Sequence, residues 1–120
     1  MIQERTLSET ENLVLSTLLR ARTETQQLMK EVDGLVVVEM KDGGMGSLRL
    51  HPRQCTAQHR LFGRQIATGE FEDADSVPVL LAINLDRDGH LFELDVWKVD
   101  YSPVIAWPTI PSAIRIDYED

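Results

Sequence analysis

The densest glycine cluster of the sequence is the segment Asp42-Gly43-Gly44-Met45-Gly46-Ser47. Successive backbone amides in such a segment can form a nest that binds an anion. A phosphate-binding P-loop would need a lysine after its last glycine, and a dinucleotide fingerprint would need a helix that opens there. Neither follows in this sequence. The cluster is therefore either the turn of a hairpin, where glycine supplies the positive φ, or a ligand-binding loop.

Glu93 and Asp95 are two positions apart in a segment that alternates apolar and polar side chains. On a strand this spacing places both carboxylates on one face, about 6–7 Å apart. Paired carboxylates at such a separation are typical of acid–base catalysis on sugars. No motif in the sequence supports catalysis, and salt bridges from Arg22, Arg64 or Lys98 would also account for these carboxylates.

Three aromatic residues, Trp97, Tyr101 and Trp107, lie within eleven positions of one another. Core packing accounts for many such residues, but Trp and Tyr are also enriched where proteins bind other proteins. Because Trp97 has the same strand parity as Glu93 and Asp95, we expect two carboxylates and an indole to share one surface.

Three histidines, His51, His59 and His90, and Cys55 are the candidates for a metal site. His51, Cys55 and His59 have the spacing of one helix face, but Pro52 interrupts that helix, and a structural zinc site needs four ligands. The turn at 86–89 resembles the start of a calcium loop and lacks its distal glutamate. We expect no metal and no other cofactor.

Charge is distributed unevenly along the 120 residues, whose formal net charge is −8. Residues 1–69 hold 9 basic and 8 acidic residues, whereas residues 70–120 hold 3 basic and 12 acidic ones. Nucleic acids and anionic membranes bind basic surfaces, so this balance argues against both as partners. The acidic half is either a solvated surface or an electronegative face that attracts a basic partner.

The compartment is predicted from cysteine content and hydropathy. The single cysteine, Cys55, excludes an intramolecular disulfide, and the first residues lack the basic and apolar regions of a signal peptide. The longest apolar run, 77–83, contains Pro78 and is far shorter than the ~20 residues that cross a bilayer. We therefore expect a cytoplasmic protein.

A helix must lie near the N-terminus. Ser8 and Glu11 have the spacing of a capping box, which predicts that a helix begins there. Apolar side chains then recur at helical intervals to about residue 31, and Gly34 ends the helix. Arg22 and Gln26 fall on this apolar stripe, which indicates a polar gap in the middle of the helix.

After residue 34 the hydrophobic period changes from 3.6 to 2, which predicts strands. The predicted strands are 36–41, 48–50, 62–68, 77–85, 91–100 and 114–118. An acidic loop is expected at 70–76. We therefore predict one α+β domain over residues 1–120, with a long N-terminal helix packed on an antiparallel sheet of about five or six strands.

Two segments resemble the signature stretches of a family of small uncharacterised bacterial proteins, a domain of unknown function. They are Asp42-Gly43-Gly44-Met45-Gly46-Ser47-Leu48 and Glu93-Leu94-Asp95-Val96-Trp97-Lys98-Val99-Asp100-Tyr101-Ser102-Pro103. The resemblance extends from Leu7 to Pro108 and implies no particular activity or catalytic residue. The second segment is also similar to segments of small immunity-type proteins linked to bacterial toxin systems.

These observations favour a non-enzymatic domain that binds a basic protein partner, in an immunity-type or regulatory role, through its acidic sheet face and aromatic residues. The alternative is a small enzyme or ligand-binding domain that uses the Gly43–Gly46 loop with Glu93 and Asp95. That alternative requires a concave pocket that joins the loop to those carboxylates. A third interpretation is a homodimer in which a second copy covers the apolar strand 77–85.

Overall fold

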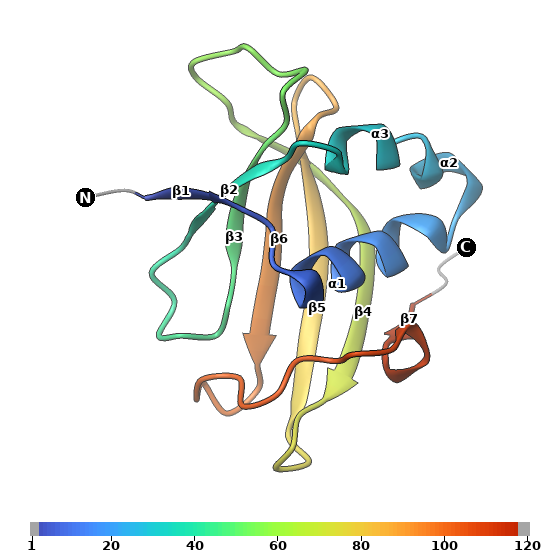
Figure 1. Cartoon of the computed structure of the whole chain (residues 1–120), viewed down its shortest axis with the longest axis vertical. Helices are drawn as coiled ribbons and strands as arrows, with labels where there is room; N and C mark the ends of the chain where they lie inside the picture. Colours follow the sequence, from blue (N-terminus) through green and yellow to red (C-terminus); the bar gives the residue numbers. More distant parts are fainter. Residues whose placement is uncertain (1–2, 118–120) are drawn as a thin grey trace.

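A computed structural model describes residues 3–117 of the chain. Within these residues seven strands form one antiparallel sheet in the order β1-β2-β3-β6-β5-β4-β7. Short helices lie against one face of this sheet, which gives two layers (Figure 1). The predicted α+β class is confirmed, and the sheet has seven strands instead of five or six.

The strands are β1 (Glu4–Thr6), β2 (Val36–Glu39), β3 (Leu48–His51), β4 (Phe62–Glu72), β5 (Pro78–Asp86), β6 (Leu91–Lys98) and β7 (Arg115–Ile116). The helices are α1 (Glu9–Arg20), α2 (Thr23–Gln26), α3 (Met29–Val32) and the 3-10 turn η1 (Pro111–Ala113). Both predicted hairpins, β2–β3 and β5–β6, are present. Strand β1 was not predicted, and β4 continues through Glu72 where a loop was expected.

The predicted long helix is divided into three short ones. Its N-terminal capping box is present, since the Ser8 side chain accepts from the Glu11 amide and the Glu11 side chain accepts from the Ser8 amide. The chain leaves the helical conformation at Arg22, whose φ of −131° is extended. Thr25 Oγ1 then donates to the carbonyl of Leu19 at 2.6 Å and satisfies the end of α1. This break removes Arg22 and Gln26 from the apolar stripe.

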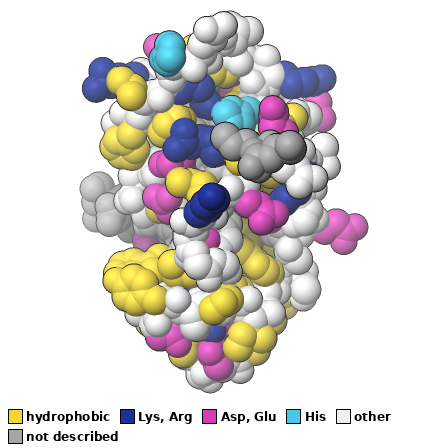
Figure 2. Space-filling model, turned by 90° about the vertical axis from the view of Figure 1, so that its left-hand side faces the viewer, with side chains coloured by type: hydrophobic (Ala, Val, Ile, Leu, Met, Phe, Trp, Pro, Cys, Tyr) yellow, Lys and Arg dark blue, Asp and Glu magenta, His cyan; other side chains and the backbone are white. Residues whose placement is uncertain are grey.

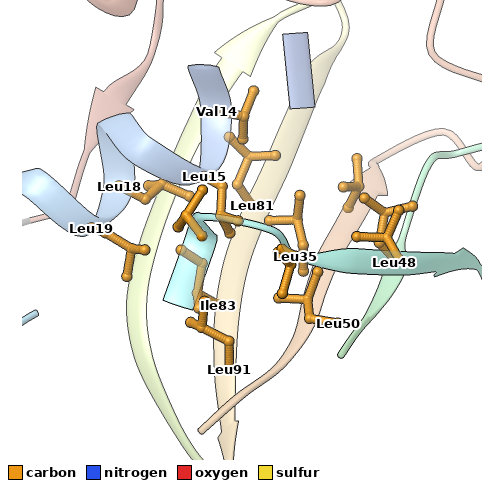
Figure 3. Close-up of a cluster of buried hydrophobic side chains, with 14 of the residues drawn as sticks. Val14, Leu15, Leu18, Leu19, Leu35, Leu48, Leu50, Leu81, Ile83 and Leu91 are labelled. Carbon is orange, nitrogen blue, oxygen red and sulfur yellow. The ribbon is translucent and has the colours of Figure 1, made fainter. Parts of the chain in front are cut away.

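The hydrophobic core lies between α1 and the sheet. Val14, Leu15, Leu18 and Leu19 of α1 are buried against leucines and isoleucines of the central strands (Figure 3). The labelled sheet residues of this cluster include Leu48, Leu50, Leu81, Ile83 and Leu91. Residues 103–110 cross the sheet on the helix side (Figure 1), where Trp107 packs against this core.

The opposite face of the sheet is called the open face here, because none of the helices within residues 3–117 covers it. Side chains alternate along β5, so that Val79 and Leu81 are buried while Leu80 is 36% exposed. The longest helix, α1, has 12 residues, and none of the helices in the described part of the chain is long and apolar enough to cross a membrane.

Candidate functional site

The strand register assembles the open face as three rows of side chains. One row joins Glu70, Leu80 and Trp97 across β4, β5 and β6. The second joins Thr68, Ala82 and Asp95, and the third joins Gln65, Asn84, Glu93 and Arg49. Glu93, Asp95 and Trp97 therefore share one face, as their alternation predicts.

A pocket of about 550 Å³ lies on the open face. Its walls include the apolar side chains of Met45, Leu80, Ala82 and Trp97. Its polar lining side chains are Asp42, Ser47, Gln65, Thr68, Asp95 and Asp117. This volume lies within the range of small-ligand and side-chain pockets, and the mixture of apolar walls with a few polar groups is typical of a binding site.

Of the three carboxylates that line this pocket, Asp42 accepts from backbone amides of its own loop, whereas Asp95 and Asp117 each accept from one neutral side chain. Asn84 Nδ2 donates to Asp95 Oδ2 at 2.9 Å, and Thr68 Oγ1 donates to Asp117 Oδ2 at 2.9 Å. Among the salt bridges of residues 3–117, none joins Asp95 or Asp117 to an Arg or Lys side chain. Both carboxylates are therefore available to a cation in the pocket.

Two other carboxylates of the open face, those of Glu93 and Glu70, are paired within the chain. Glu93 accepts from Arg49 Nη2 at 3.3 Å, and Glu70 pairs with Arg115. The predicted partners of Glu93 and Asp95 are wrong, because among residues 3–117 neither carboxylate forms a salt bridge with Arg22, Arg64 or Lys98. Arg22 donates to the backbone carbonyl of Asp117 and Lys98 binds other carboxylates.

The glycine cluster forms the β2–β3 turn, with positive φ at Gly43, Gly44 and Gly46. The carboxylate of Asp42 accepts from the amides of Met45 and Ser47 at 3.1 and 2.8 Å, and from Gly46 at 3.4 Å. These amides are the donors that an anion nest would offer. The loop therefore binds its own carboxylate, and Met45 is the residue that it contributes to an apolar wall of the pocket.

The three aromatic residues do not form one cluster. Trp97 and Tyr101 are 43% and 69% exposed, and their ring centroids are 5.7 Å apart. Tyr101 has a φ of 65°, a left-handed conformation that is costly for an aromatic residue. Trp107 instead packs against Phe71, also at 5.7 Å, and against Gly46. Trp107 is thus a core-side residue, separate from the Trp97–Tyr101 pair.

Acidic residues of the β4–β5 turn form a second site, called the Lys98 cluster here. Lys98 Nζ lies 2.9 Å from Asp73 and 2.7 Å from Asp75, and the Lys98 and Asp73 side chains are fully buried. Burial favours the neutral form of Asp73, but hydrogen bonds from the Ile105 and Ala106 amides and from Lys98 outweigh it and hold its pKa well below the usual range. Burial likewise opposes the charge of Lys98, yet both carboxylates keep its pKa above the usual range.

Arg60 forms a third polar cluster at the other end of β5 and β6, which sequence reasoning missed. Its guanidinium donates to Asp86 Oδ2 at 2.8 Å and to the carbonyls of Leu50 and Leu91. Burial favours the neutral form of Asp86, but hydrogen bonds from His90 and Arg60 lower its pKa. A lone arginine in a segment without periodicity carries no signal that would reveal such a role.

The potential metal ligands of the sequence are not brought together in the described residues. Among residues 3–117, no three His, Cys, Asp or Glu side chains are grouped so that they could hold a metal ion. Cys55 instead lies with its Sγ 3.9 Å from Asp86 Oδ2.

The acidic half of the sequence does not form one electronegative face. Asp73 and Asp86 are buried in ion pairs at opposite ends of the sheet, and Glu70 is paired at its surface. Figure 2, viewed from the side of β1 and β2, shows hydrophobic side chains gathered in its lower half with acidic side chains beside them. The candidate site is the open-face pocket, with the carboxylates of Asp95 and Asp117.

Comparison with protein-family models matches residues 4–108 to a domain of unknown function, DUF6984. The matched range contains β1 to β6, and with them all of the pocket except Asp117. No curated protein and no solved structure matches the chain. Since the model covers most of the 120 residues, the chain belongs to the DUF6984 family.

Proposed function

We propose that this protein is a non-enzymatic binding domain whose open face docks a basic segment of another protein. The observation that carries the proposal is the pocket in which Asp95 and Asp117 line one cavity without a cation from the described chain. A partner that supplies positive charge would gain ion pairs there. Charge complementarity of this kind favours a cationic partner and speeds its association.

The aromatic pair beside the pocket supports the same proposal. Trp97 lines the pocket, and Tyr101 packs against Trp97 while most of its own side chain is exposed. Large aromatic side chains at a surface are the usual anchors of protein interfaces. The positive φ of Tyr101 is a strained backbone conformation for a non-glycine residue. Backbone strain of this kind is concentrated at functional sites, which supports a binding role for Tyr101.

The enzyme alternative has weaker support. The pocket does join the glycine loop to Asp95, but Glu93 is absent from its lining and is paired with Arg49. The amides of Met45, Gly46 and Ser47 already donate to Asp42, so these three are not free for an anionic substrate. The binding domain that we propose would act in the bacterial cytoplasm, with an immunity-type or regulatory role as suggested by the similarity of the 93–103 segment.

The test is affinity capture from a bacterial lysate with five immobilised proteins, at low and at moderate salt. Wild type and the control Phe62→Ala should retain the same protein, because Phe62 is exposed but does not line the pocket. Trp97→Ala should lose it. The retained protein should be basic, and its retention should weaken as salt rises. Asp88→Asn, an exposed carboxylate of the β5–β6 turn, is the matched charge control for Asp95→Asn.

Three outcomes would contradict the proposal. Capture of no protein at either salt concentration would do so, as would capture that Trp97→Ala leaves unchanged. A wild-type dimer in solution that Trp97→Asp converts to a monomer would show that a second copy covers the open face instead.

A further inference from the structure

We propose that the open-face pocket recognises an arginine side chain of the partner, an inference that rests on the proposed function. The pocket offers apolar side chains and, apart from Asp42, two carboxylates that each have one oxygen without a donor in residues 3–117. These match the apolar stem and the charged end of one long basic side chain. The choice between arginine and lysine depends on how the two carboxylates are placed.

The carboxylates approach the pocket from opposite sides. Asp95 lies on β6. Asp117 lies beyond β4, on the side away from β5, where its amide donates to the carbonyl of Thr68. Three strand spacings separate these positions, so their Cα atoms are about 14 Å apart. Each side chain leans inward, because Asn84 on β5 holds Asp95 and Thr68 on β4 holds Asp117.

Each carboxylate keeps one oxygen for a ligand. The bonds from Asn84 and Thr68 both reach an Oδ2 atom, and no donor within residues 3–117 reaches Oδ1 of Asp95 or Asp117. A group that satisfies both must donate in two opposite directions across the gap. A guanidinium has five N–H donors along its edges, whereas an ammonium is a compact point charge.

The apolar walls fit the rest of an arginine side chain. Leu80 and Ala82 form the floor from β5, and Met45 from the β2–β3 turn lies at the pocket's edge. Trp97 offers an indole, the aromatic surface that cations bind best, and a guanidinium can stack on it while its edges donate to carboxylates. Gln65 and Thr68 add polar groups to the same wall.

The test is a titration of the ¹⁵N-labelled protein with N-acetyl-arginine amide, followed by amide chemical shifts. We expect shifts at the pocket residues of β4, β5 and β6, with Thr68, Ala82 and Asp95 among them. The citrulline analogue has the same shape without the charge and should bind about tenfold more weakly. The lysine analogue should also be weaker than arginine, since it can satisfy one carboxylate well but not both.

Variants test the two carboxylates individually. Asp95→Asn and Asp117→Asn should each weaken arginine binding several-fold, while Asp88→Asn should leave it unchanged. Because the three ligands are compared on the wild-type protein, the inference is tested even if a variant fails to fold. Shifts that are absent, or that are equal for arginine and citrulline or for arginine and lysine, would overturn it.

The outcomes also separate this inference from the proposed function. If a basic protein is captured through Trp97 but arginine does not enter the pocket, the inference fails and the proposed function stands. If arginine fills the pocket but no protein is captured, the proposed function fails, and the pocket is a site for a free guanidinium compound.

Discussion

The Lys98 cluster and the open-face pocket are both rich in carboxylates, and they differ in where the positive charge comes from. In the Lys98 cluster the chain supplies it, with Nζ within 2.9 Å of Asp73 and 2.7 Å of Asp75. In the pocket, the carboxylates of Asp95 and Asp117 accept, among residues 3–117, only from the neutral side chains of Asn84 and Thr68. A buried carboxylate must be paired because its desolvation is costly. A carboxylate at an open pocket stays hydrated and needs no cation from its own chain.

The Lys98 cluster also holds the chain together. Asp73 accepts from the amides of Ile105 and Ala106 at 2.8 and 2.9 Å, and Lys98 Nζ donates to the carbonyl of Pro103. These bonds fasten residues 103–106 to the β4–β5 turn. The cluster is therefore structural, and the difference between the two regions predicts opposite responses to mutation.

Removal of the internal cation should have the largest effect. Lys98→Met leaves Asp73 buried without its cation, and we expect the thermal midpoint to fall by roughly 10–20 °C. Differential scanning calorimetry measures this, with the exposed Lys30→Met as a control that should stay near wild type. The double variant Asp73→Asn, Lys98→Met should recover part of the lost thermal midpoint, because it no longer buries an unpaired carboxylate. An unchanged midpoint for Lys98→Met would mean that the cluster is as well solvated as the pocket.

The pH dependence of stability should show the same difference. Because the pKa of Asp73 is lower in the folded protein than in the unfolded chain, its stabilisation is fully present above about pH 4 and is lost as the pH falls further. In Lys98→Met this pKa should rise, so that acid unfolding begins about one pH unit higher.

Thermal midpoints of both proteins between pH 2 and 7 provide the measurement. The carboxylates of Glu11 and Asp86, whose pKa values are also lowered, contribute to both curves, so only the difference between the curves reports Asp73. Superimposable acid limbs would contradict the assignment.

Strain at Tyr101 should have a smaller effect on stability. Glycine adopts a φ of 65° without strain and alanine does not, so Tyr101→Gly should be more stable than Tyr101→Ala by about 1 kcal/mol. Both substitutions remove the aromatic ring and should weaken partner capture equally. Urea unfolding of the two variants checks the first statement. Equal stabilities would show that this turn relaxes without strain.

Neutralising the pocket should have the smallest effect on stability. Asparagine at position 95 or 117 can still accept from Asn84 or Thr68, and no ion pair of the described chain is lost. We expect Asp95→Asn and Asp117→Asn to change the thermal midpoint by less than about 2 °C, as is usual for substitutions at a surface. A drop as large as that of Lys98→Met would remove the distinction between the two regions.

Local signals predicted much of the fold. The capping box at Ser8 and Glu11, the alternation of β2 and β6 and the glycine turns were all read correctly, because each depends on neighbours within a few residues. The only sign of the helix break in the sequence was the polar Arg22 on an apolar stripe, and this did not by itself predict a break. Strand β1 was not predicted, because three residues are too few to show the alternation of a strand.

The candidate site was predicted only in part. Alternation along one strand correctly grouped Glu93, Asp95 and Trp97 on one face. It did not indicate that Trp107 turns to the core side, nor that Asp117 joins Asp95 in one pocket, because both depend on how residues 99–117 return across the sheet.

By itself the sequence determined the periodicity, and therefore which side chains of each element share a face. It also determined a surplus of acidic residues, but the tertiary structure alone decided which of them are neutralised. Glu93 is paired by Arg49, 44 positions away, while Asp95, its near neighbour in sequence, is not paired within the described chain. The reason is physical, since a Coulomb interaction depends on distance in space and on burial, and neither follows from distance along the chain.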